Sequence, residues 1–247
     1  MNPKELLEIL SVAEKLKCNT RHCDTSSGRR ESVAEHSWRT ALMAMLLTKE
    51  FPEADMDKVI RMCLIHDMGE AFTGDIPTFA KTGADTRKED DILLNWVSTL
   101  PEDAREEWTA LLTEMNDMET REAKIYKALD KMEAVIQHNE SDISTWLPLE
   151  YDLQLTYGEK NVQFSPYMRQ LKAEVNDRTR EKIAREKPDK TPQYCKTLRM
   201  PFRAYGGLFL SDTQGTEAYY LRRTGCASLC SRRISPAAAS RQALMML

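Results

Sequence analysis

The chain has 247 residues, with 35 Lys and Arg side chains against 39 Asp and Glu and a formal net charge of −4. Hydrophobic residues make up 41% and charged residues 30%. This composition is that of a globular protein, and it excludes collagen-like, mucin-like and wholly disordered chains. The small net charge also argues against a general binder of nucleic acid or of anionic membranes.

The charge is distributed unevenly along the chain. Residues 189–247 hold nine Lys and Arg and three acidic residues, a net charge of +6. The remaining 26 basic and 36 acidic groups give residues 1–188 a net charge of −10. The sequence therefore predicts two parts, an acidic body over 1–188 and a basic tail over 189–247.

Apolar runs and cysteines indicate the compartment. No run of about 18 apolar residues is present, so no membrane span is expected. The first ten residues mix acidic with apolar side chains and do not resemble a signal peptide. Six cysteines are too few for a disulfide scaffold, and their spacing fits no zinc knuckle. We expect a cytoplasmic protein with reduced thiols.

Hydrophobic periodicity predicts helices along most of the acidic body. The first follows a stripe that runs from Leu6 to Leu16, and the second begins after Ser32, a candidate N-cap. Helices are expected at about 33–50, 55–68, 86–99, 102–115, 120–139 and 166–186. A loop is expected over 73–81, where Gly74 and Pro77 interrupt the pattern, and residues 141–165 are expected to be irregular. Convincing strand alternation is absent from 1–188, so the body is predicted to be all-α.

The basic tail lacks helical periodicity and is rich in Arg, Ser, Gly and Ala. A short apolar run from Tyr205 to Leu210 could pair as a strand. We expect residues 189–247 to form a poorly ordered extension, and a non-native one such as a shifted reading frame is an alternative. We attribute no function to it.

Four side chains of the body suggest a metal site. His66 and Asp67 are adjacent, and His36 and Asp130 belong to other predicted helices. Imidazole and carboxylate together suit a divalent first-row metal with open coordination positions, and facing helices of a bundle can supply such a set. Each residue also has an ordinary structural explanation, and spacing alone does not decide between the two. A metal here would favour hydrolysis of a phosphate ester.

The order of these residues resembles the signature of the HD superfamily of metal-dependent phosphohydrolases. Residues 33–37 and 66–78, the second with the pattern HDxxExxxGDxPT, are similar to the branch that contains bacterial 5′-deoxynucleotidases. The resemblance covers about residues 5–187 and leaves out the tail. It implies an all-helical HD-domain bundle with a metal at its centre, held by His36, His66, Asp67 and Asp130.

The resemblance also implies roles for two further acids. Glu70 and Asp75 match family residues that act near the attacking water. Glu70 lies four residues after His66, on the same face if the helix continues that far, and Asp75 lies in the predicted loop. Their structural alternatives are a charge at a helix end and a turn-forming aspartate.

Three residues are candidates for binding substrate. Arg21 matches a phosphate-contacting arginine of the deoxynucleotidases, and a guanidinium fork suits a phosphate dianion. The family carries an aromatic residue beside this arginine that helps exclude the ribose 2′-hydroxyl. This chain has His22 there, a departure that puts strict deoxyribose selectivity in doubt. Lys81 is a second candidate for binding phosphate, with a solvated loop lysine as the alternative.

These features predict an enzyme that removes the 5′-phosphate from (deoxy)nucleoside 5′-monophosphates by attack of a metal-associated water. The metal ion could be Mn, Co, Fe, Zn, Ni or Mg. The expected partner is the small-molecule nucleotide, and the resemblance is compatible with a homodimer. Three alternatives remain: another HD hydrolase, acting on cyclic nucleotides, nucleoside triphosphates or other small phosphomonoesters; a non-catalytic helical binding module; and nucleic-acid binding through the basic tail.

Overall fold

The computed structural model of the chain describes residues 1–186, 208–211, 218–223 and 229–234. The chain divides into two compact units, Met1–Pro188 and Asp189–Leu247. Within the described residues, no helix is long and apolar enough to cross a membrane.

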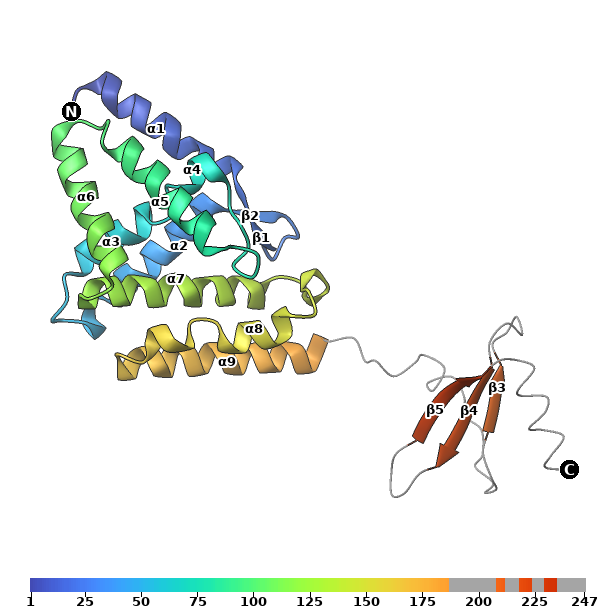
Figure 1. Cartoon of the computed structure of the whole chain (residues 1–247). Helices are drawn as coiled ribbons and strands as arrows, with labels where there is room; N and C mark the ends of the chain where they lie inside the picture. Colours follow the sequence, from blue (N-terminus) through green and yellow to red (C-terminus); the bar gives the residue numbers. More distant parts are fainter. Residues whose placement is uncertain (187–207, 212–217, 224–228, 235–247) are drawn as a thin grey trace, which may run out of the picture. The chain divides into compact units, whose positions relative to one another are not determined.

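The first unit is predominantly helical, as the sequence predicts, and the expected all-α fold class is confirmed (Figure 1). Short 3₁₀ helices lie at η1 (Thr48–Glu50), η2 (Ile143–Thr145) and η3 (Glu159–Val162). Its α-helices are α1 (Pro3–Cys18), α2 (Val33–Leu46), α3 (Met56–Ile65), α4 (Glu70–Thr73), α5 (Gly83–Val97), α6 (Glu102–Asp117), α7 (Arg121–Glu140), α8 (Glu150–Thr156) and α9 (Pro166–Glu186).

Helix α7 lies at the centre of this unit. It packs against α2, α3 and α6 and, elsewhere along its length, against α9 and η3 (Figure 1). Its apolar side chains Ile125, Leu129 and Met132 are completely buried, which follows from their helical spacing. Because α7 is enclosed, polar side chains on its inner faces must find partners within the protein.

The start of α2 is fixed by a capping box. The Ser32 side chain accepts a hydrogen bond from the backbone N–H of Glu35, and the Glu35 carboxylate accepts one from the backbone N–H of Ser32. This confirms Ser32 as the N-cap. With the helix beginning at Val33, His36 falls in the first turn, on the face that packs into the core.

Two expectations for the first unit are wrong: that it contains no strands, and that residues 141–165 are irregular. Strands β1 (Thr20–Asp24) and β2 (Arg30–Ser32) pair as an antiparallel hairpin, with Thr20 opposite Ser32 and Asp24 opposite Arg30. Such short strands give too few residues for an alternation to be recognised. Residues 141–165, expected to be irregular, contain α8 and two 3₁₀ helices.

The second unit contains a three-stranded antiparallel sheet in the order β3 (Leu208–Ser211), β4 (Ala218–Arg223) and β5 (Leu229–Ile234). Strand β3 begins within the apolar run at 205–210 that could pair as a strand. The expectation of a poorly ordered tail over 189–247 falls mainly on 189–207, 212–217, 224–228 and 235–247. These lie outside the described residues, and that expectation stays a prediction.

Candidate metal centre

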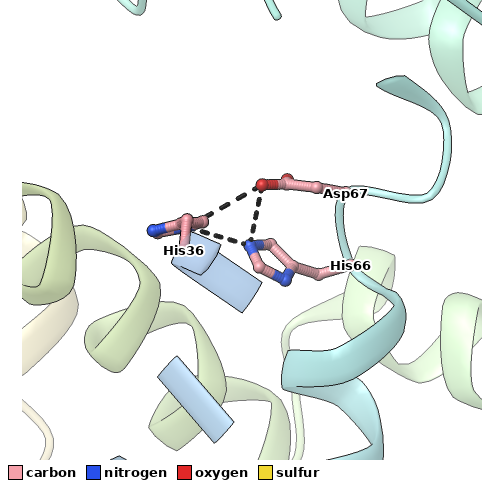
Figure 2. Close-up of side chains that lie close together, drawn as sticks. All are labelled: His36, His66 and Asp67. Carbon is pink, nitrogen blue, oxygen red and sulfur yellow. Dashed lines mark hydrogen bonds and ion pairs between the residues drawn. The ribbon is translucent and has the colours of Figure 1, made fainter. Parts of the chain in front are cut away.

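Three structural elements bring the predicted metal ligands together. His36 comes from the first turn of α2, and Asp130 from the middle of α7. His66 and Asp67 lie in the turn between α3 and α4, where the break in the helix lets adjacent side chains face the same space. Figure 2 shows His36, His66 and Asp67 pointing toward one another.

The donor atoms of His36, His66 and Asp67 lie within 4.8 Å of one another, and Asp130 approaches both histidines. The Nε2 atoms of His36 and His66 are 3.2 Å apart. Asp67 Oδ2 lies 3.2 Å from His66 Nε2 and 3.7 Å from His36 Nε2. Asp130 Oδ1 lies 3.4 Å from His36 Nε2 and 3.8 Å from His66 Nε2. Nitrogen and oxygen ligands bind a divalent metal at about 2.0–2.2 Å, so this spacing is compatible with one ion among them.

The far sides of the two imidazole rings determine what their Nε2 atoms can do. His66 Nδ1 lies 2.8 Å from the carbonyl oxygen of Cys63, to which it donates, and His36 Nδ1 is hydrogen-bonded to the Glu133 carboxylate. In the neutral rings both Nε2 atoms therefore present lone pairs. Two facing lone pairs repel unless a cation or proton lies between them. The donor set therefore fits a divalent metal.

Glu133 is a residue that the sequence analysis missed. It is completely buried, its carboxylate bonds His36 Nδ1, and its second oxygen accepts a hydrogen bond of 2.6 Å from Arg39 Nε. Burial raises the pKa of Glu133, but His36 and Arg39 lower it more, so it is held as a carboxylate. A sequence signal did exist, because Glu133 lies three residues after Asp130 and shares its face of α7.

The charge around His36 favours a cation. Burial and Arg21 lower the pKa of His36, but Glu133 and Asp130 raise it more, to about 10. Asp67 behaves in the opposite sense: burial raises its pKa, whereas His66, His36 and Arg21 lower it well below its usual range. The site thus combines ionised carboxylates with an imidazole whose protonated form they stabilise.

Asp130 is also held by two lysines of its own helix. Its Oδ2 lies 2.9 Å from Lys127 Nζ and 3.7 Å from Lys131 Nζ, which leaves Oδ1 directed at the histidines. Burial raises the pKa of Asp130, but these two lysines and His36 lower it well below its ordinary value. Asp130 is therefore a buried carboxylate with one oxygen free to ligate.

The β1–β2 hairpin brings Arg21 to the edge of the site. Arg21 Nη1 lies 3.4 Å from Asp67 Oδ2, and its Nε lies 3.3 Å from Glu31 Oε2. Glu31 is buried and accepts a hydrogen bond from the Cys23 thiol. Sequence reasoning missed Glu31 and Cys23, whose contacts depend on the hairpin. They hold one edge of the guanidinium beside the predicted metal ligands.

The two predicted catalytic acids differ in their surroundings. Glu70 is 3% exposed, and burial together with Asp67 and Asp75 raises its pKa to about 9. Its Oε2 is buried and has no hydrogen-bond partner among the described residues. Burial also raises the pKa of Asp75, whose carboxylate accepts a hydrogen bond from the backbone of His22. Glu70 is therefore a proton-holding group with an unsatisfied oxygen.

A small pocket adjoins the site. Arg21, His22 and Asp75 of the predicted residues contribute to its wall. Lys81 does not: its Nζ pairs with Glu89 at 2.7 Å. The lining residues are Arg21, His22, Cys23, Asp75, Pro77, Thr78, Phe79, His138, Glu150, Leu153, Gln154 and Tyr157.

A sequence model of the HD domain matches residues 13–172, most of the first unit. The chain belongs to the HD-domain family. This confirms the resemblance seen in the sequence, and the protein is an HD-domain phosphohydrolase related to proteins named 5′-deoxynucleotidases.

Individual relatives agree with this placement. The HD-domain protein is 32% identical over 141 residues to human 5′-deoxynucleotidase HDDC2, covering 56% of this chain and 68% of that protein. It is 25% identical over 148 residues to the Saccharomyces cerevisiae 5′-deoxynucleotidase YBR242W, covering 55% and 60%. A crystal structure of a predicted metal-dependent phosphohydrolase from Magnetospirillum magnetotacticum superimposes with a TM-score of 0.60. That chain is 28% identical, and the match covers 72% of this chain and 93% of that one.

Proposed function

We propose that this HD-domain protein removes the 5′-phosphate from nucleoside 5′-monophosphates in a metal-dependent reaction. The observation that carries the proposal is the convergence of four donor atoms from His36, His66, Asp67 and Asp130 beside a pocket that contains Arg21. The names of the human and yeast relatives support a nucleotide as the substrate.

The four converging residues would hold the metal. When bound there, a divalent ion polarises a phosphoryl oxygen and lowers the pKa of a bound water. The hydrogen bonds on the two Nδ1 atoms keep the Nε2 atoms directed at the centre, and Glu133 fixes the orientation of His36.

Arg21 would bind the phosphate. Its Nε and Nη1 face Glu31 and Asp67, which holds the guanidinium plane in place and leaves its remaining N–H groups for a phosphate dianion. A guanidinium already fixed by ion pairs loses little conformational freedom when the substrate binds.

Glu70 would accept the proton of the attacking water in those molecules in which its carboxyl is ionised. A general base works best when its pKa lies near the working pH, and the raised pKa of Glu70 brings it closer to that range than an ordinary carboxyl. Its unsatisfied Oε2 offers the acceptor. Asp75, held by the His22 backbone on the pocket wall, would orient the same water or the phosphate.

Phosphate release tests this function. The metal-loaded protein is assayed with AMP, dAMP, dATP and cyclic AMP in the presence of Mn²⁺, Co²⁺ or Mg²⁺. Release from the monophosphates is expected; turnover confined to dATP or cyclic AMP would indicate another HD hydrolase, and bound metal with no turnover at all would indicate a binding module.

Substitutions of the proposed ligands provide the structural test. His66→Ala and Asp67→Asn are expected to lose bound metal and to lower kcat/KM by more than about a hundredfold, because each removes a donor. Asp57→Asn, on the exposed side of α3, is the matched control and should retain both properties. Full activity in His66→Ala or Asp67→Asn contradicts the site.

A further inference from the structure

The segment between α4 and α5, residues 74–82, is called the pocket loop below, because it contributes to the pocket wall. Its residues 74–77 adopt no regular secondary structure, so its position depends strongly on side-chain contacts. On one side it is held by β1, where the Asp75 carboxylate accepts a hydrogen bond from the backbone of His22. The lining residues that it supplies are Asp75, Pro77, Thr78 and Phe79.

Tyr157 holds the pocket loop on its other side. Its hydroxyl oxygen lies 3.1 Å from Thr78 Oγ1, a hydrogen bond between residues 79 positions apart in the sequence. Tyr157 directly follows α8 and is itself a lining residue of the pocket. The loop therefore has contacts on two walls of the pocket, at β1 and at the end of α8.

Lys131 of α7 contacts the same hydroxyl. Its Nζ lies 2.6 Å from Tyr157 Oη, a hydrogen bond, and 3.7 Å from Asp130 Oδ2, an ion pair too long for a hydrogen bond. An ammonium group only donates, so it uses a lone pair of Tyr157 Oη and leaves the hydroxyl hydrogen available for Thr78. A charged donor on the phenol oxygen also strengthens the bond that the phenol donates.

The backbone around Tyr157 is fixed by two other helices. Gly158 has φ of 76°, and a Cβ added there would lie 2.7 Å from Lys131 Cβ, so this turn is pressed against α7. The last turn of α8 is held by α9, whose side chains donate to its backbone carbonyls, Lys172 to Gln154 at 3.2 Å and Asn176 to Leu155 at 3.0 Å. Tyr157 is therefore a fixed anchor for the pocket loop.

We propose that Lys131 and Tyr157 are positioning residues that hold the pocket loop, through the Thr78 hydroxyl, in the position that receives the nucleotide. This inference rests on the proposed function. A loop that is already held loses little conformational freedom when the substrate binds, so the contact should increase the affinity for the nucleotide. Asp75 keeps its own contact with the His22 backbone, so the rate of the chemical step should change less than binding.

Three hydroxyl deletions form the test set. Tyr157→Phe and Thr78→Val each remove one partner of the contact while keeping the size of the side chain, and the double variant completes the cycle. Thr156→Val is the matched control. Thr156 is the exposed neighbour of Tyr157, and its hydroxyl contacts only backbone carbonyls of its own helix, those of Asp152 and Leu153.

Amide hydrogen exchange, followed by NMR on the metal-loaded full chain without nucleotide, measures how firmly the loop is held. The backbone N–H groups of Ala80 and Lys81 both bond to the Pro77 carbonyl in the turn that contains Thr78. Each single variant is expected to speed their exchange about three- to tenfold, the value of one hydrogen bond. The double variant should exchange no faster than the single ones, because both changes break the same contact. Thr156→Val should leave exchange unchanged. Wild-type exchange in Tyr157→Phe and Thr78→Val, or additive effects in the double variant, overturns the inference.

Steady-state kinetics with AMP and dAMP measure the effect on the substrate. Tyr157→Phe, Thr78→Val and the double variant should each raise KM about three- to tenfold, with kcat within about twofold of the wild type. A fall in kcat with unchanged KM overturns the inference, because it would place Tyr157 in the chemical step. Faster exchange of the loop without turnover of any nucleotide would support the anchoring and contradict the proposed function alone.

Substitutions of Lys131 test its part separately. Lys131→Met keeps the aliphatic stem beneath Gly158 and removes the ammonium group, so it should speed loop exchange and raise KM in the same direction as Tyr157→Phe. Lys131→Arg keeps a charged donor and should restore both properties at least partly. Chelator competition checks that the metal affinity is retained. Wild-type loop exchange and KM in Lys131→Met would overturn the role of Lys131.

Discussion

His36 makes contacts of two kinds at opposite edges of its ring. Nε2 faces His66, Asp67 and Asp130, and Nδ1 is bonded to the buried Glu133. A carboxylate on the far nitrogen of a ligating histidine fixes the ring and increases the basicity of the ligating atom. The metal affinity of the proposed site is therefore expected to depend on Glu133, which lies at the opposite edge of the His36 ring.

Glu133→Gln is expected to weaken metal binding about 10–100-fold while the protein stays folded. Arg39 offers a matched control, because it bonds Glu133 through Nε and the exposed Glu140 through Nη1. Glu140→Gln disturbs Arg39 without touching His36 and should leave the affinity unchanged. Competition with a chelator measures the metal affinity of both variants. Equal metal affinities of Glu133→Gln and Glu140→Gln would contradict this role of Glu133.

Metal binding is also expected to depend on pH. The pKa of His36 is raised to about 10, so below that pH a proton occupies the position that the metal needs. Because binding must release this proton, the affinity should rise as the pH rises, by about tenfold per unit between pH 6 and pH 8. Chelator competition across this range checks the slope. A flat profile would show that no proton is displaced.

The four proposed metal ligands could be picked out from the sequence, whereas the residues that support them could not. His36, His66, Asp67 and Asp130 stand in a recognisable order, and the structure brings their donor atoms together. Glu31 acts only through Arg21 and Cys23, across a hairpin that the sequence did not reveal. A buried carboxylate of this kind leaves no local pattern, because its partners come from distant parts of the chain.

At the scale of elements, the length of each helix or strand decided whether it could be predicted. Helices such as α7 and α9 extend over enough turns for their apolar stripe to be recognised. The strands Thr20–Asp24 and Arg30–Ser32 and the helix Glu150–Thr156 are too short to show a period. These short elements carry His22, Arg21 and Glu150, so the wall of the pocket was less predictable than the cluster of proposed metal ligands.

Gly74 controls the exit from α4. Its backbone has φ of 75° and ψ of 163°, a conformation that essentially only glycine adopts, and Asp75 follows directly. Gly74→Ala is expected to lower the free energy of unfolding by about 1–3 kcal/mol and to reduce kcat/KM by displacing Asp75. Chemical denaturation and the phosphate assay measure the two effects.

Gly83→Ala is the control for this substitution. Gly83 begins α5 without a positive φ, and an added Cβ would lie 3.5 Å from Arg87 Nη1, an ordinary contact. Because alanine suits a helix better than glycine, this variant should be unchanged or slightly more stable. Equal losses in both variants would show that the conformation of Gly74 is not the cause.

At the scale of the whole molecule, the acidic first unit contains all the residues of the proposed site. The HD-domain match at 13–172 also falls within it. A chain ending at residue 188 is therefore expected to bind metal and to keep kcat/KM within about twofold of the full chain. A loss of more than about tenfold in a truncated protein with native helix content would assign the basic tail a part in catalysis.

The same pair of proteins addresses nucleic-acid binding. The net charge of +6 on residues 189–247 could contact phosphates, in which case retention on immobilised DNA or RNA would fall steeply with salt. Retention that is equal with and without the tail would dispose of that alternative.

The four proposed ligands stand between positions 36 and 130, on elements that meet only in the folded first unit. No short piece of the unfolded chain can present all of them, so the ion is expected to bind the native state and hardly the unfolded state. At an ion concentration of a hundred times the dissociation constant, binding then adds about 2.7 kcal/mol to the free energy of unfolding. The concentration of the ion would therefore affect the stability of the protein as well as its activity. At low concentrations of the ion, the same protein would be both inactive and less stable toward unfolding.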